Sequence, residues 1–144
     1  MSHDPSRRST SSETNQQLDR EAAARVRDYA EAGPEALEKR IKELDKEWDM
    51  DRTLMANAST LSLLGFAASR TVSRRWLVLP GVVSTMLLWH AIQGWCPPLP
   101  VFRKLGFRTR KEIDAEKYAL KALRGDFTAV TPSSPDQAWE AAQR

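Results

Sequence analysis

The side chains that could take part in chemistry gather near the end of the most apolar stretch of this 144-residue sequence. His90 and Gln93 are three positions apart, so they share one side of a helix. A polar group inside a long apolar helix carries a free-energy cost and often marks a transport or proton-transfer site. No acidic residue lies in the apolar stretches to complete a proton relay. We therefore expect both side chains to hydrogen-bond to a serine or threonine of a neighbouring helix, or to a second copy of the chain.

Cys96 is the only cysteine, which excludes an intramolecular disulfide and a cysteine-rich metal site. A thiol can react, but the sequence singles out no residue that would activate this one, and we expect it to be inert. The only histidines, His3 and His90, are too far apart along the chain to suggest a transition-metal site. With no catalytic motif, the sequence predicts a protein that is not an enzyme and binds no cofactor.

Charged residues are segregated along the chain. Residues 1–53 carry 10 basic and 13 acidic side chains, and residues 97–144 carry 9 basic and 6 acidic ones. Between them, residues 54–96 carry arginines at positions 70, 74 and 75 and no acid. A soluble domain spreads its charges over every amphipathic element, so this apolar middle indicates a membrane segment.

Two uncharged stretches account for the apolar middle, Thr53–Ser69 and Trp76–Cys96. As helices they would be about 26 and 31 Å long, enough for a thin bilayer and an average one respectively. Because residues 70–75 are too few to cross a bilayer, the two helices must be antiparallel neighbours. The sequence therefore predicts an all-α fold built on an integral membrane two-helix hairpin, with 53–69 and 76–96 as spans and 70–75 as a periplasmic turn. A soluble bundle with two buried helices is the alternative, and the apolar character of residues 76–89 on every side disfavours it.

Amphipathic cytoplasmic helices are expected on both sides of the hairpin. No glycine or proline interrupts residues 35–64, so one helix is expected to run unbroken into the first span. The predicted divisions outside the hairpin are a disordered tail (1–13), cytoplasmic helices (14–52), a basic juxtamembrane segment with a further helix (97–127) and a C-terminal tail (128–144).

A basic cluster follows the second span, where anionic lipid headgroups are its expected counter-charges. The cluster consists of Arg103, Lys104, Arg108, Arg110 and Lys111. Elsewhere basic and acidic residues are interleaved, so no nucleic-acid partner is expected. More basic residues flank the spans than lie in the turn, which predicts that both termini are cytoplasmic. Residues 1–15 also lack the apolar core of a cleavable signal peptide.

One helix face carries residues spaced alternately four and three apart, and we name it the stripe. Its residues are Leu37, Ile41, Leu44, Trp48, Asp51, Met55, Ala58, Ser62, Gly65 and Ser69. The first four are large and apolar, whereas the last four are small enough for close backbone approach in lipid. The stripe predicts a homodimer with a left-handed crossing. The alternative is packing within one chain, on Leu120 and Leu123 for the upper half and on Gly81, Ser84 or Thr85 for the lower.

The end of the second span, Gly94-Trp95-Cys96-Pro97, followed by Leu105-Gly106-Phe107, is similar to the YgaP-like inner-membrane domain of bacteria. The resemblance covers about residues 50–110 and rests on Gly94, Cys96, Pro97 and Gly106. It implies a two-helix hairpin of unassigned function in the bacterial inner membrane, found alone or as the anchor of a rhodanese. The chain has no rhodanese domain, so sulfurtransferase activity is not implied.

Together these features predict a small, oligomeric, multi-pass inner-membrane protein. Its cytoplasmic helices would bind an unidentified protein partner, and its spans would contact membrane lipid. One alternative is a membrane module for a separate sulfur or redox enzyme, which it would contact through Cys96. The other is a small oligomeric transporter or channel subunit that uses His90 and Gln93.

Overall fold

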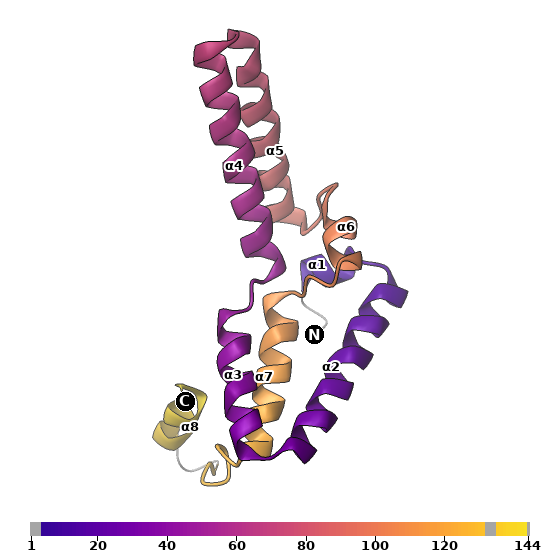
Figure 1. Cartoon of the computed structure of the whole chain (residues 1–144), viewed down its shortest axis with the longest axis vertical. Coiled ribbons are helices and arrows are strands. Elements are labelled where there is room, and N and C mark those ends of the chain that lie inside the picture. The colour runs from indigo at the N-terminus through magenta and orange to yellow at the C-terminus, as the bar shows by residue number, and fades with distance from the viewer. Residues whose placement is uncertain (1–3, 132–134, 144) are drawn as a thin grey trace. The chain divides into compact units, whose positions relative to one another are not determined.

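The computed structural model describes residues 4–131 and 135–143, and all regular structure within them is helical (Figure 1). The all-α prediction is therefore confirmed. The elements are α1 (Pro5–Arg8), α2 (Ser12–Ala32), α3 (Pro34–Lys46), α4 (Met50–Thr71), the short 3-10 helix η1 (Arg74–Leu77), α5 (Val78–Gln93), α6 (Leu99–Lys104), α7 (Arg110–Arg124) and α8 (Pro135–Gln143). The chain divides into two compact units, 1–18 with 48–111 and 19–47 with 112–144.

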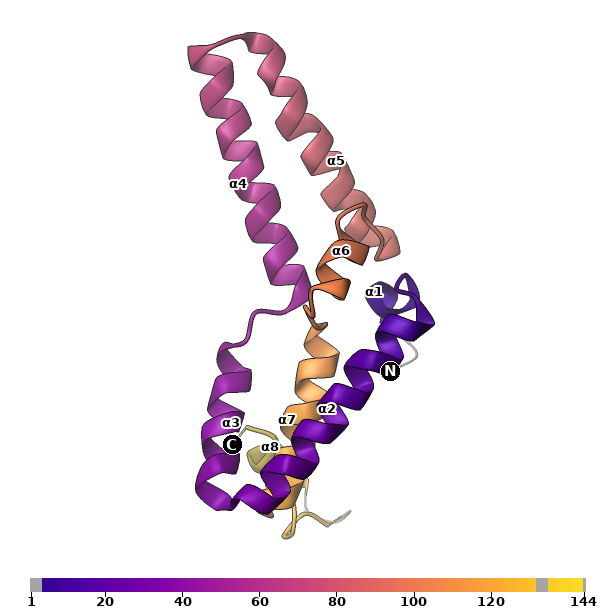
Figure 2. The ribbon, with the colours of Figure 1, turned by 45° about the vertical axis from the view of Figure 1, so that its right-hand side comes forward.

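The first unit is built on α4 and α5, which run antiparallel and are joined through η1 (Figures 1 and 2). They pack tightly at Gly65, where an added Cβ would lie 2.6 Å from Cδ of Pro80 and 3.3 Å from Cβ of Leu79. No residue other than glycine fits at this contact. Gly65 of the stripe thus packs within the chain, against residues just before the predicted Gly81. Ala58 and Ser62 line a pocket together with the predicted Ser84 of α5.

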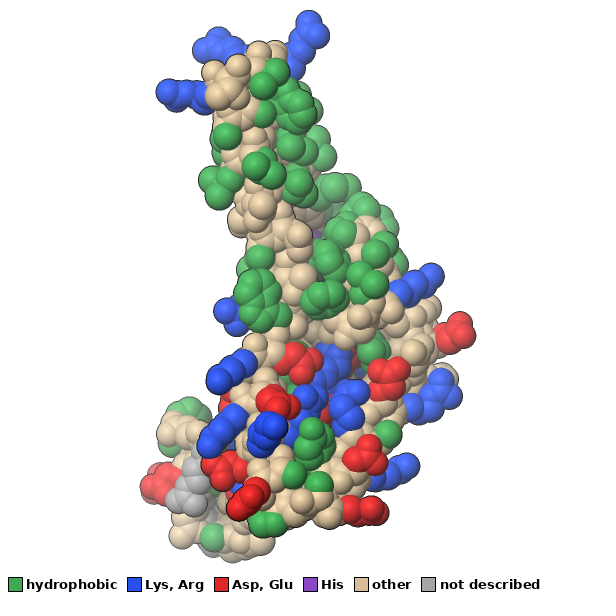
Figure 3. Space-filling model, in the orientation of Figure 1, with side chains coloured by type: hydrophobic (Ala, Val, Ile, Leu, Met, Phe, Trp, Pro, Cys, Tyr) green, Lys and Arg blue, Asp and Glu red, His purple; other side chains and the backbone are tan. Residues whose placement is uncertain are grey.

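One helix in the described part of the chain, Arg74–Gln93, is long and apolar enough to cross a membrane by length and composition. Only 6% of its most apolar window is buried by the protein. In Figure 3, apolar side chains gather along the α4–α5 pair, and basic side chains lie at its tip. The tip contains the arginines at the end of α4 and in η1.

The helix predicted to run unbroken through residues 35–64 is interrupted. Helix α3 ends at Lys46, and α4 begins at Met50. Asp49 caps α4, because its side chain accepts a hydrogen bond from the Arg52 amide at 2.8 Å. The amide of Met50 donates to the carbonyl of Arg108 at 2.8 Å, which ties this new helix start to the segment before α7. The stripe therefore does not form one continuous face.

The predicted tail 1–13 also differs from the structure, which places α1 and the start of α2 within it. Asp4 caps α1 by accepting from the Arg7 amide at 3.2 Å, and Pro5 occupies the first helical position. The predicted C-terminal tail 128–144 contains α8, while residues 132–134 and 144 lie outside the described residues.

The second unit has a core formed by one face of α3 and one face of α7. Its buried residues are Leu37, Ile41, Leu44, Ile113 and Leu120. Val26 and Tyr29 of α2 pack against them. Three of the four large stripe residues are thus covered by their own chain, as the intramolecular alternative required. Leu120 is one of the predicted partners, whereas Leu123 is half exposed and Ile113 takes its place.

Candidate functional site

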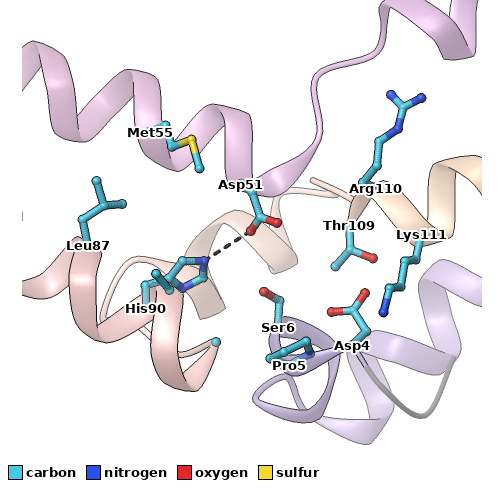
Figure 4. Close-up of a pocket in the computed structure, with 12 residues that line it drawn as sticks. Asp4, Pro5, Ser6, Asp51, Met55, Leu87, His90, Thr109, Arg110 and Lys111 are labelled. Carbon is cyan, nitrogen blue, oxygen red and sulfur yellow. Dashed lines mark hydrogen bonds and ion pairs between the residues drawn. The ribbon is translucent and has the colours of Figure 1, made fainter.

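A cavity of about 300 Å³ lies at the end of the α4–α5 pair remote from η1 (Figure 4). Segments from α1, α4, α5 and the start of α7 contribute to its wall, and all of them belong to the first unit. The lining residues are Asp4, Pro5, Ser6, Asp51, Met55, Leu87, His90, Ala91, Gly94, Thr109, Arg110 and Lys111. The wall combines carboxylates, cations and aliphatic side chains, which is the composition of a site for an amphipathic ligand.

The centre of the cavity is a pair formed by His90 and Asp51. Nε2 of His90 lies 3.2 Å from Oδ1 of Asp51 (Figure 4). The imidazole is nine-tenths buried, whereas the Asp51 carboxylate is half exposed. A carboxylate only accepts, so the pair fixes a proton on Nε2. His90 Nδ1 is buried and has no hydrogen-bond partner.

This pair corrects the sequence-based expectation for His90. We expected a serine or threonine of the neighbouring helix, or a second copy, as its partner. The partner is instead an acid two residues before the predicted first span. The one sequence signal for it was that Asp51 interrupts the stripe at an otherwise unexplained position.

The ends of two helices fix the pair in place. Asp51 lies in the first turn of α4, two residues after the Asp49 cap. His90 lies in the last turn of α5, which ends at Gly94 in the left-handed conformation, with φ of 72°. An added Cβ at Gly94 would lie 2.6 Å from the carbonyl carbon of Pro5. Glycine is thus required here both for the helix end and for the close approach of α1.

The other two candidate residues do not join the cavity wall. Gln93, for which a serine, a threonine or a second copy was the expected partner, is exposed and does not line the cavity that His90 lines. Cys96 lies beyond the end of α5 and is buried with Met50, Leu54 and Leu99. Burial, together with the negative charge of Asp51, raises the pKa of the Cys96 thiol.

Alkylation should therefore reveal an unreactive Cys96. With the native protein, we expect N-ethylmaleimide to label Cys96 several-fold more slowly than an exposed thiol such as Ala129→Cys in a Cys96→Ala background. Because the raised pKa depletes the thiolate, the rate should keep rising with pH above the range where an exposed cysteine levels off, near pH ~8.5. Denaturation should abolish the difference. Equal rates in the native protein would show that the thiol is accessible and activated.

The basic cluster splits into buried and exposed members. Arg103 and Arg108 are buried, and Arg103 donates to Oδ1 of Asn15 at 2.8 Å and to the carbonyl of Phe107 at 3.2 Å. A guanidinium held in this way stabilises the protein interior, so the headgroup role predicted for Arg103 and Arg108 is not supported. Lys104, Arg110 and Lys111 are exposed.

Within the described ranges, no group of three or more His, Cys, Asp or Glu side chains could hold a metal ion. The cavity can instead receive both a cationic and an anionic group. Its carboxylates suit the first, and its basic residues suit the second.

No family model matches the chain, and no match was found among curated proteins or solved structures.

Proposed function

We propose that the chain is a non-enzymatic integral membrane protein in which α4 and α5 cross the bilayer together. The observation that carries this proposal is the exposure of apolar side chains around both helices. Leu63 is 68% exposed, Leu88 62% and Ile92 72%. Further exposed apolar side chains of the pair are Leu61, Leu64, Phe66, Val78, Val82, Met86 and Trp89. So large an apolar surface is unfavourable in water and favourable in lipid.

Helix α4 alone is a weak span because it contains several polar side chains. Four of these donate to carbonyls of the preceding turn of their own helix, at distances of 2.7 to 3.0 Å. They are Asn57, Thr60, Ser69 and Thr71. This bonding lowers the cost of placing them in lipid. Because α4 packs against α5 at Gly65, insertion of α5 would carry α4 into the bilayer with it.

The orientation we propose places both termini in the cytoplasm of a bacterium, with η1 on the periplasmic side of the inner membrane. Basic residues before α4 and after α5 outnumber those at the η1 end, as the positive-inside rule requires. The resemblance of residues 94–107 to the YgaP-like domain agrees with this location and implies no further activity.

Cysteine labelling in whole cells tests both the crossing and the orientation. Single cysteines replace Ser12, Ser73 or Ala129 in a Cys96→Ala background, alanine being chosen because Cys96 has apolar neighbours. An impermeant maleimide should label Ser73→Cys alone in intact cells and all three after lysis. Labelling of Ser12→Cys or Ala129→Cys in intact cells would show that the termini are periplasmic and would contradict the proposed orientation. Recovery of the protein in the soluble fraction would contradict the membrane proposal altogether.

The second unit would then provide a cytoplasmic surface for an unidentified protein partner. We also propose that the protein is oligomeric, although the stripe no longer argues for a particular interface, because its buried residues are covered by the same chain. The sulfur or redox alternative is weakened by the burial of Cys96. The transporter alternative gains an acid in Asp51, but two helices enclose no pathway, so it needs at least three or four copies.

A further inference from the structure

We propose that the cavity at the His90–Asp51 pair binds the headgroup of a phospholipid that carries a primary ammonium as well as a phosphate. This inference rests on the proposed function, because it requires α4 and α5 to lie in a bilayer. The cavity would then open at the membrane surface, where headgroups and the first carbons of acyl chains are found.

The cavity wall changes from polar to apolar along the helices. Met55 lies one turn beyond Asp51 in α4, and Leu87 lies almost one turn before His90 in α5. Both are on the side of the cavity nearer the middle of the two spans. Asp4 and Lys111 come from segments outside the spans (Figure 4). A ligand with a polar head and an apolar body matches this gradient, whereas a small soluble ion would leave the apolar part of the wall unused.

The cavity wall carries both acidic and basic side chains, so it favours a headgroup that itself carries both charges. An acidic headgroup without a cation would meet the carboxylates of Asp4 and Asp51, whereas a zwitterion can place its phosphate toward Lys111 and its cation toward Asp51. In Figure 4 the Arg110 guanidinium points away from His90, and Lys111 is the other cation on the wall.

The half-exposed Asp51 carboxylate also distinguishes between kinds of cation. A primary ammonium has three N–H donors, and a carboxylate accepts from it in a short, charge-assisted hydrogen bond. A trimethylammonium has no N–H group and cannot make this bond. Nδ1 of His90 is buried and has no hydrogen-bond partner, so Asp51 is the acceptor that the pair offers to the ligand.

Native mass spectrometry of the full-length protein in detergent tests the proposal, with palmitoyl-oleoyl phosphatidylethanolamine, phosphatidylcholine and phosphatidylglycerol offered at equal concentrations. We expect the ethanolamine lipid to be bound about tenfold more than either of the others, the difference that one charge-assisted hydrogen bond supplies. Equal binding of the ethanolamine and choline lipids, or preference for the glycerol lipid, would overturn the proposal.

Two variants and one soluble competitor sharpen this test. Asp51→Asn keeps the shape of the side chain and removes its charge, so the preference for ethanolamine over choline should be lost. Asp28→Asn, at an exposed position of α2 in the second unit, should retain it. If circular dichroism shows that Asp51→Asn does not fold, the proposal is judged only from how strongly the parent protein prefers the ethanolamine lipid to the other two lipids. Displacement of the lipid by millimolar free phosphoethanolamine would show that the ligand is the soluble compound and overturn the lipid assignment.

Extraction of membranes with alkaline carbonate distinguishes a wrong lipid assignment from a wrong membrane assignment. Protein that stays with the membrane but shows no ethanolamine preference leaves the membrane proposal intact and overturns the lipid site. Protein released by carbonate overturns both.

Discussion

Replacing Gly65 with leucine should separate α4 from α5. The added Cβ would lie 2.6 Å from Cδ of Pro80, and a proline ring cannot rotate out of the way. Overpacking of a tight contact typically lowers the free energy of unfolding by about 1–3 kcal/mol. Because leucine adds a branched side chain and not a single methyl group, we expect a loss at or above the upper end of this range. We expect a lower midpoint of unfolding when the purified protein is titrated with sodium dodecyl sulfate in mixed micelles and followed by circular dichroism.

The control for Gly65→Leu is Leu63→Ala, which lies two residues away and is 68% exposed. Because its side chain is mostly exposed, truncation to alanine should change the midpoint much less than Gly65→Leu does. Cross-linking of the two variants adds a second measurement. If Gly65→Leu abolishes cross-links between copies but leaves the stability of each copy unchanged, Gly65 lies in a dimer interface and not in the α4–α5 contact.

The stripe shows how far a helical repeat can be taken. The repeat correctly predicted that Leu37, Ile41 and Leu44 are buried, because water drives such a face against any apolar surface. It could not name that surface, since a heptad-like pattern is the same for a neighbouring copy and for another helix of the same chain. In the structure, α7 supplies the surface through Ile113 and Leu120.

The broken helix at residues 47–49 was predictable in principle. Glycine and proline are the usual helix breakers, and neither is present there. Asp49 begins a helix by capping the Arg52 amide, and a good cap can outweigh the propensity of its neighbours to continue the preceding helix. The same signal was available at Asp4, followed by Pro5, where a disordered tail was predicted instead.

The site was harder to predict than the helices. His90 and Asp51 were both visible as unusual residues, but 39 positions separate them, and only the antiparallel contact of α4 and α5 brings them together. The membrane boundaries drawn from charge also placed Asp51 outside the span and His90 inside it. For Arg103, charge and position were readable from the sequence, whereas its burial and its hydrogen bond to Asn15, 88 positions away, were not.

Glu116 is the ionic centre of the second unit, and no motif or spacing in the sequence marks it. Its side chain is fully buried. One oxygen, Oε2, accepts from Arg25 at 3.1 Å, and the other, Oε1, accepts from Arg40 at 2.9 Å. Helices α2, α3 and α7 are thereby joined through one carboxylate. A periodicity search overlooks such a residue because it treats every glutamate as solvent-exposed.

Replacing Glu116 with alanine should therefore destabilise the second unit strongly. Loss of one partner of a buried ion pair leaves uncompensated charge and typically costs about 3–5 kcal/mol, and the partial exposure of Arg25 places the expected value near the lower end. Thermal unfolding of the full-length protein, followed by circular dichroism at 222 nm, should show a clearly lowered midpoint. The matched control is Glu38→Ala, which removes an exposed glutamate paired with Lys42 on α3 and should leave the midpoint unchanged. If the two variants unfold at the same temperature as the parent, Glu116 does not hold the three helices together, and the apolar contacts of Leu44, Ile113 and Leu120 alone suffice.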